Sequence, residues 1–181
     1  MSALFDDAEA LRKVAVNLFY GWGYNFYRVE NHLRADDQMV RAQVGALLGR
    51  ARAAVEQAEG AWRRERIAPP TREKPLPDPA AMEGARRLEA LSRAIGALEG
   101  QIRAQPVPEG DHMTDRHRRE KETLQKLCDA DAALVGGAEI LRGLVEDATP
   151  ALLAERAAEI DGGLKGLARR LHERQALLMG P

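Results

Sequence analysis

Apolar residues recur every three or four positions along most of the chain, and this spacing predicts long amphipathic helices. A first helix is expected over about 8–20, where Asp6 and Asp7 supply cap residues. A cap at Ala35-Asp36-Asp37 is expected to start a long helix that reaches about residue 66. The apolar stripe of this long helix comprises Val40, Val44, Leu47, Ala51, Val55, Ala58 and Trp62.

A proline-rich segment over 68–79 interrupts the helical pattern, because it holds five of the nine prolines in the chain. We expect a semi-rigid connection there, at one end of a helical hairpin. Asp78 followed by Pro79 predicts a new helix that runs to about residue 104. Its stripe follows the heptad spacing typical of coiled coils, with Leu88, Leu91, Ile95, Leu98 and Ile102.

Two further helices are expected, over about 115–147 after a Thr114 cap and over about 151–179 after a Thr149-Pro150 corner. Their stripes are Leu124, Leu127, Asp131, Leu134, Ala138, Leu141 and Val145, then Leu153, Ala157, Ile160, Leu164, Leu167, Leu171 and Leu178. Asp131 is the polar residue that breaks its stripe. A buried carboxylate needs a partner, and a polar seam position can fix the register between helices.

These elements predict an all-α fold, an elongated up-and-down antiparallel bundle of four long helices with a shorter aromatic helical unit at the N-terminus. The expected organisation is an aromatic unit over 1–35 packed on a long-helix bundle over 36–181. Glycines near the seams are expected to permit close helix approach, at Gly45, Gly49, Gly136, Gly137, Gly162, Gly163 and Gly166. Because such a core is thin, we expect a second copy or another partner to cover part of the apolar surface.

Aromatic residues are concentrated near the N-terminus, where six of the eight in the chain lie between Phe19 and Tyr27. Gly21 and Gly23 favour a helix break or kink beside Trp22. A helix over 24–34 would place hydroxyl, amide and guanidinium groups near one face. The candidate partner- or ligand-binding residues are Tyr20, Trp22, Tyr24, Tyr27, Arg28, Asn31, His32 and Arg34. The alternative interpretation is that these rings only fill the end of the bundle.

Charge and composition narrow the classes of partner. Net charge is −1, which removes the main electrostatic reason to expect nucleic acid or an anionic membrane. A weaker alternative remains in two basic clusters that antiparallel helices would bring to one end. The clusters are Arg116, His117, Arg118, Arg119, Lys121 and Lys126, and Arg169, Arg170 and Arg174.

Cysteine content and hydropathy indicate the compartment. The single Cys128 excludes an internal disulfide and fits a reducing environment. No window approaches the roughly 20 apolar residues that cross a bilayer, and the first residues are acidic rather than basic. A cytoplasmic protein is expected, and the Ala, Arg and Leu content is typical of proteins from GC-rich bacterial genomes.

Candidate chemistry is weak throughout. A Glu lies three residues before only one of the four histidines (Glu109 before His112), whereas a di-iron bundle requires this pair on two helices. The pair Glu155 and Glu159 lies among arginines, which favours a solvated, ion-paired face over a magnesium site. We therefore expect no cofactor and no metal, and a non-catalytic module that binds another protein through the aromatic segment 19–37. The alternative is a small-molecule-binding protein or enzyme with its pocket at the same segment.

Overall fold

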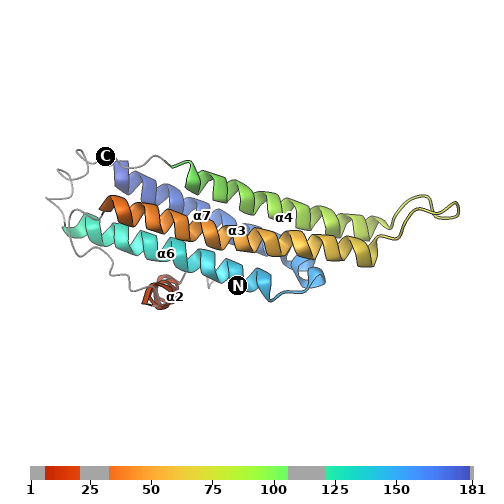
Figure 1. The fold of residues 1–181 in the computed structure, drawn as a ribbon, viewed down its shortest axis with the longest axis horizontal. Helices are drawn as coiled ribbons and strands as arrows, with labels where there is room; N and C mark the ends of the chain where they lie inside the picture. Colours follow the sequence, from red (N-terminus) through yellow and green to blue (C-terminus); the bar gives the residue numbers. More distant parts are fainter. Residues whose placement is uncertain (1–6, 21–32, 106–120, 180–181) are drawn as a thin grey trace.

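The computed structural model describes residues 7–20, 33–105 and 121–179, which form five α-helices and no strand in these ranges. The helices are α2 (Ala8–Tyr20), α3 (Leu33–Arg66), α4 (Pro79–Arg103), α6 (Lys121–Glu146) and α7 (Pro150–Met179) (Figure 1). The expected all-α bundle is therefore confirmed.

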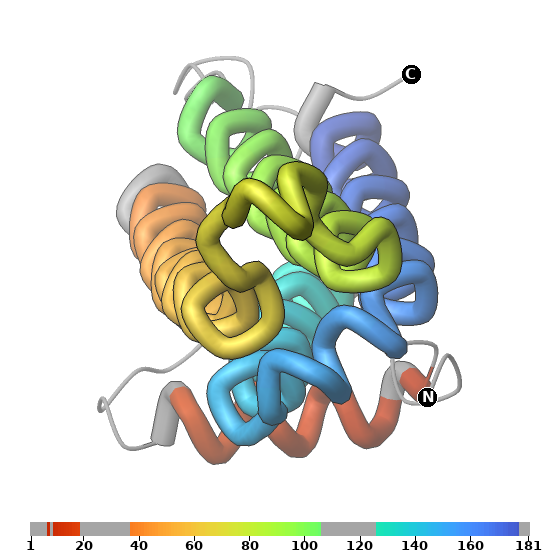
Figure 2. The backbone as a smooth tube through the Cα atoms, turned by 90° about the vertical axis from the view of Figure 1, so that its right-hand side faces the viewer, coloured from red at the N-terminus to blue at the C-terminus, as the bar shows by residue number. Residues whose placement is uncertain are grey.

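The four long helices form one bundle in which consecutive helices run in opposite directions (Figure 1). α3 packs on α4 and α6, and α7 packs on the same two helices. The bundle thus consists of two antiparallel hairpins, α3/α4 and α6/α7, placed side by side with α3 parallel to α6 and α4 parallel to α7 (Figures 1 and 2). The chain passes from α4 to α6 between diagonally opposite positions of the bundle.

The short helix α2 lies across the outside of the bundle and packs on α6 (Figure 2). Its Leu11 and Ala15 are fully buried. A Cβ atom on Gly136 would lie only 2.2 Å from the Leu11 carbonyl oxygen, so glycine is required where the two backbones cross. The helix α6 is enclosed between α2 and the core, which explains why every residue over 131–138 is buried.

The predicted apolar stripes form the core. Their described members are buried apart from Trp62, which is half-buried, as the stripe members Val44, Leu88, Leu141 and Leu164 illustrate. The predicted close approach is confirmed at Gly136 and at Gly137, whose Cβ would meet Leu167 at 2.6 Å. At Gly162 and Gly166 a Cβ would meet nothing within 4 Å, so the expectation of a glycine seam there is wrong.

Helix starts agree with the sequence prediction in three places and differ in one. The Asp7 carboxylate accepts hydrogen bonds from the Glu9 and Ala10 amides at the start of α2. The Asp78 carboxylate accepts hydrogen bonds from the Ala80 and Ala81 amides at the start of α4. Thr149 accepts one from the Leu152 amide at the start of α7. The expected cap at 35–37 is wrong, because α3 already begins at Leu33 and the Asp37 carboxylate makes contacts inside the bundle instead.

The α3/α4 connection forms a hairpin loop, residues 67–78, that projects beyond the other helices (Figure 1). Where the loop joins the two helices, the Trp62 indole N–H donates to the Ala81 carbonyl at 2.8 Å. A Cβ on Gly84 would lie 2.3 Å from the Trp62 ring, so this glycine makes room for the indole. The loop itself is ordered by a hydrogen bond from the Thr71 amide to the Lys74 carbonyl and one from the Lys74 amide to the Thr71 hydroxyl.

Candidate functional site

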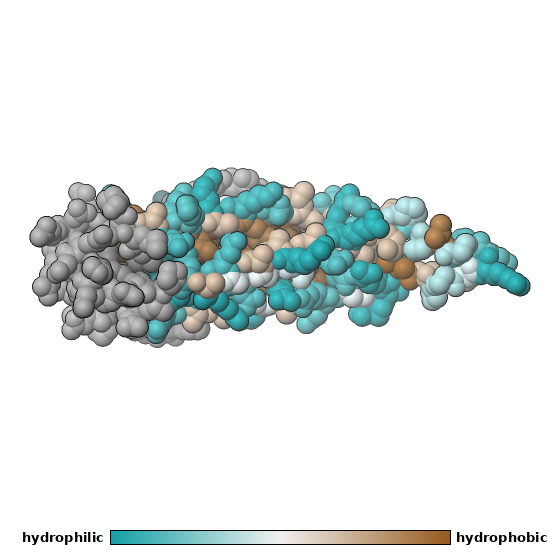
Figure 3. All heavy atoms as spheres, turned by 90° about the horizontal axis from the view of Figure 1, so that it is seen from above, coloured by the Kyte–Doolittle hydropathy of each residue, from teal (hydrophilic) through white to brown (hydrophobic). Residues whose placement is uncertain are grey.

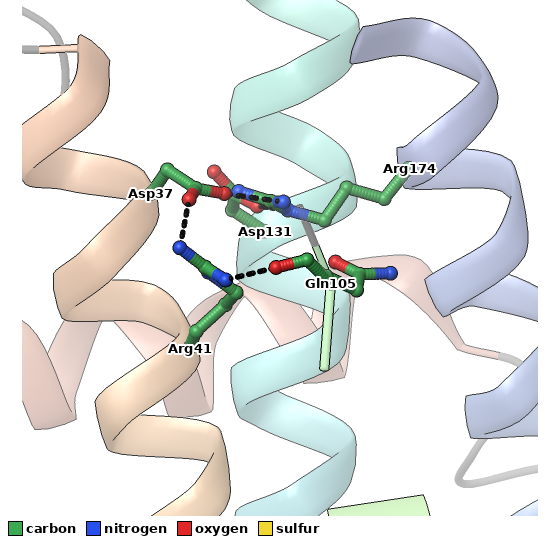
Figure 4. Close-up of polar contacts among 5 residues, drawn as sticks. All are labelled: Asp37, Arg41, Gln105, Asp131 and Arg174. Atoms are coloured by element: carbon green, nitrogen blue, oxygen red, sulfur yellow. Dashed lines mark hydrogen bonds and ion pairs between the residues drawn. The ribbon is translucent and has the colours of Figure 1, made fainter. Parts of the chain in front are cut away.

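Four charged side chains meet inside the bundle, at the end where α3 and α6 begin and α7 finishes (Figure 4). Arg174 on α7 donates through Nη1 to Asp37 Oδ1 on α3 at 2.8 Å, and through Nε to Asp131 on α6. Arg41, one turn after Asp37, places Nη2 2.8 Å from Asp37 Oδ2. We call Asp37, Arg41, Asp131 and Arg174 the buried charge cluster.

The cluster also holds the end of α4. Arg41 Nη1 donates to the Gln105 backbone carbonyl at 2.7 Å, just past the last residue of that helix. Side chains from three helices and a backbone carbonyl from the fourth thus share one polar network (Figure 4). Its formal charge is zero, since two arginines face two aspartates. Asp37 Oδ2 meets Arg41 as an ion pair without hydrogen-bond alignment, and Arg41 Nε has no hydrogen-bond partner among the described residues.

Burial makes this network strongly electrostatic. Side-chain exposure is 0% for Asp131, 1% for Arg174 and 3% for Asp37. Burial by itself lowers the pKa of Arg174, but attraction to Asp131 and then to Asp37 outweighs it and raises that pKa above its ordinary value. Because this pKa is raised, Arg174 remains charged across the whole neutral range, and its ion pairs stabilise the fold there.

The arrangement is suited to holding helices together rather than to reacting with a ligand. A general acid or base must come within hydrogen-bond reach of a substrate. The three most buried members are inaccessible to solvent, and they form ion pairs with one another. The predicted need of Asp131 for a partner is confirmed, with Arg174 as that partner.

The sequence-predicted binding residues fall outside the described part of the chain. Trp22, Tyr24, Tyr27, Arg28, Asn31 and His32 lie in the segment 21–32, which the structure does not describe. Tyr20 ends α2 and Arg34 is near the start of α3, but their side chains are likewise not described. Binding of a partner or ligand by these residues therefore stays a prediction. One end of the segment 19–37 is corrected, because Asp37 is buried in the charge cluster and not exposed for docking.

The second basic cluster differs from the sequence prediction. Arg174 was expected to join Arg169 and Arg170 on the surface, but it is buried and held by two carboxylates. Arg169 is exposed and lies 3.8 Å from Glu173. Of the first cluster, 116–119 lie outside the described residues, and Lys126 is exposed. Glu155 and Glu159 are both exposed, as a solvated face requires.

Two surface grooves are the other features of interest. One lies between α4 and α7, with a volume of about 470 Å³, and is lined by Arg87, Ala90, Leu91, Ala154, Glu155, Ala157, Ala158 and Asp161. The other lies near the α6/α7 turn, with a volume of about 270 Å³, and Leu144, Leu152 and Ile160 are among its lining residues. Within the described ranges, no three His, Cys, Asp or Glu side chains are grouped so as to hold a metal ion.

Three members of the charge cluster were not identified from sequence, although a signal was present. Arg174 continues the α7 stripe, three residues after Leu171. Asp37 precedes Val40 by three residues in the α3 stripe. Three polar residues at stripe positions of three helices, two acidic and one basic, indicate a buried ionic contact.

None of the helices described is long and apolar enough to cross a membrane. No known protein family, curated protein or solved structure matches this chain.

Proposed function

We propose that this chain is a non-catalytic helical module that binds another protein through its aromatic segment, as an adaptor, assembly factor or structural subunit. The observation that supports this proposal is the buried charge cluster. It holds Asp37, the last residue of the segment 19–37, which lies about one helical turn after the start of α3 at Leu33. The bundle thus offers that segment a fixed base.

A fixed base matters for binding because ordering a flexible surface costs part of the interaction energy. Arg41 and Arg174 together hold the first turns of α3 against α4, α6 and α7. Tyrosine, tryptophan and arginine are the residue types most often found as energetic centres of protein interfaces. The segment 19–37 contains all three types next to this base.

The test compares three forms of the full chain. The first is wild type, the second carries Tyr24→Ala with Arg28→Ala, and the third carries Arg86→Ala with Arg93→Ala on the exposed face of α4. Each is used to isolate partners from the native host, with quantitative mass spectrometry as the readout. Any partner found is then purified and titrated against all three forms, while circular dichroism records their melting.

We expect the aromatic double variant to weaken the purified complex by at least about tenfold, with melting close to that of wild type. The α4 control should bind as wild type does. Equal binding by all three forms would contradict the proposal. Loss of binding together with several kcal/mol of stability in the aromatic variant would show instead that these side chains belong to the core.

A further inference from the structure

The groove between α4 and α7 has an apolar floor that the rest of the described chain leaves open. Leu91, Ala154 and Ala157 form this floor and are buried, while Ala90 and Ala158 on its walls are exposed. The groove exists because the alanine side chains are too short to fill the space between the two parallel helices. Its volume of about 470 Å³ accommodates several apolar side chains.

The hairpin loop carries the most exposed large apolar side chain among the described residues. Leu76 is 82% exposed, while Met39 and Val16 are 42% and 38% exposed. Pro75 and Pro77 flank Leu76, and each fixes one backbone dihedral and restricts the residue before it. A stiffened loop loses little conformational entropy when it binds. Figure 3 shows this projection as a narrow extension that is hydrophilic at its tip, with a small hydrophobic patch on one side behind the tip.

We propose that two copies of the chain form a twofold dimer in which the hairpin loop of each copy docks in the α4/α7 groove of the other. Leu76 enters the groove and covers its alanine floor. The proposal commits to a second copy because one molecule carries both the exposed leucine and an open apolar groove. It is independent of the proposed binding through the aromatic segment, since the charge cluster beside that segment lies at the opposite end of the bundle (Figure 1).

The distances along the chain allow both contacts to form at once. Arg87 and Leu91 lie roughly 12 and 18 Å along α4 from Pro79, at 1.5 Å per residue. Leu76 precedes Pro79 by three residues and lies at most about 10 Å beyond the helix start. A twofold axis close to the start of α4 therefore brings Leu76 of each copy to the groove of the other copy, near Arg87 and Leu91. A twofold contact closes on itself and does not continue into filaments.

Charge supports the same pairing. In the loop 67–78, the exposed Arg72 and Lys74 are balanced by Glu73 and Asp78, but the hydrogen-bonded turn 71–74 alone carries a net charge of +1. In the groove lining, Glu155 and Asp161 provide two carboxylates against the single guanidinium of Arg87. A weakly basic turn thus meets a weakly acidic groove lining, in which Asp161 is also paired with Lys165 at 2.8 Å. This complementarity helps to orient the docked loop, while the buried Leu76 accounts for most of the affinity.

The first experiment measures mass in solution by light scattering after size-exclusion chromatography. Wild type at about 100 μM is expected as a dimer, twice the 19.9 kDa of the chain. Leu76→Asp and Ala158→Asp should each raise the dimer dissociation constant by about tenfold or more, because each places a carboxylate in an apolar contact. Ala97→Asp, at an exposed position on α4 outside the groove lining, is the control and should remain dimeric.

A crosslinking experiment then tests which surfaces meet. In a Cys128→Ala background, chains with Leu76→Cys are mixed with chains carrying Ala158→Cys and are mildly oxidised. A disulfide between the two kinds of chain is expected, whereas mixing Leu76→Cys with Ala97→Cys should give little. A monomer at 100 μM, a dimer indifferent to Leu76→Asp, or equal crosslinking to residues 97 and 158 would each overturn the proposal. Circular dichroism checks that every variant is folded.

Discussion

The two ends of the bundle are stabilised by different kinds of contact. At the charged end, Arg174 joins Asp131 and Asp37, which are 43 and 137 residues away along the chain. At the hairpin end, Trp62 bonds to Ala81 only 19 residues away, and the Asp78 cap acts within three residues. The charged end depends on long-range ionic contacts, and the hairpin end on local ones. This difference determines which end tolerates substitution.

A buried ion pair and a local cap respond differently to the loss of one member. Removing one member of a buried ionic set leaves its partner charged and desolvated, which costs far more than the intact pair contributes. Removing a cap leaves backbone amides that water can still hydrogen-bond. Crowding the hairpin displaces neighbouring side chains, which can partly accommodate the added atoms. The charged end is therefore expected to be the more sensitive of the two.

The largest effect is expected for Arg174→Met. Methionine keeps most of the side-chain volume but removes the charge that neutralises two carboxylates at 0–3% exposure. The free energy of unfolding should fall by about 3–5 kcal/mol. Denaturant unfolding followed by circular dichroism measures this change, and hydrogen exchange should show the greatest loss of protection at the first turns of α3.

The matched control for Arg174→Met is the double variant Asp131→Leu with Arg174→Met. It removes one cation and one anion and leaves Arg41 paired with Asp37. Replacing a buried ion pair by apolar residues is often neutral or stabilising, so most of the lost stability should return. If the double variant is no more stable than Arg174→Met alone, the cost comes from packing and not from unpaired charge.

A smaller effect is expected at the hairpin end for Gly84→Ala. The new methyl would lie 2.3 Å from the Trp62 ring, which must move and loses its hydrogen bond to Ala81. Crowding of this kind costs about 1–3 kcal/mol. The measurement is again denaturant unfolding, together with tryptophan fluorescence, since Trp62 is one of only two tryptophans.

Gly100→Ala provides the comparison on the same helix. A Cβ at Gly100 meets nothing within 4 Å, so the substitution should stabilise the protein by up to about 1 kcal/mol through helix propensity alone. Opposite signs for the two substitutions would confirm that contact with Trp62 decides the result at Gly84. A loss of stability at both positions would contradict this account.

The same contrast explains how much of the structure the sequence predicts. The hairpin end could be predicted because its signals are local: Asp78 before Pro79 predicts the start of α4, and the prolines before it predict the connection. The apolar spacing of α3, α4, α6 and α7 predicts the core because helical periodicity is also a local property. These parts of the prediction are confirmed by the buried positions.

The charged end was predicted only in part, because its contacts depend on how distant segments are placed. The break in the stripe at Asp131 indicated that a partner was needed, but no local rule names Arg174 as that partner. Asp37 was misassigned as a cap since an Asp before an apolar stripe is a common helix start. Gly84 was also missed, because its role depends on an indole from another helix. The predicted binding residues on 20–34 remain a prediction.

The smallest loss of stability should come from substitutions of Asp78, which test how local the hairpin end is. Alanine cannot accept the hydrogen bonds from the Ala80 and Ala81 amides, and the loss of a cap costs about 1 kcal/mol. Asp78→Asn keeps an acceptor and removes only the charge, so it should cost a few tenths of a kcal/mol, because a negative charge favours a helix N-terminus. Both changes are measured by denaturant unfolding. If Asp78→Ala destabilised the protein as much as Arg174→Met, the hairpin end would be cooperative with the whole bundle, and its stability could not be attributed to contacts within a few residues.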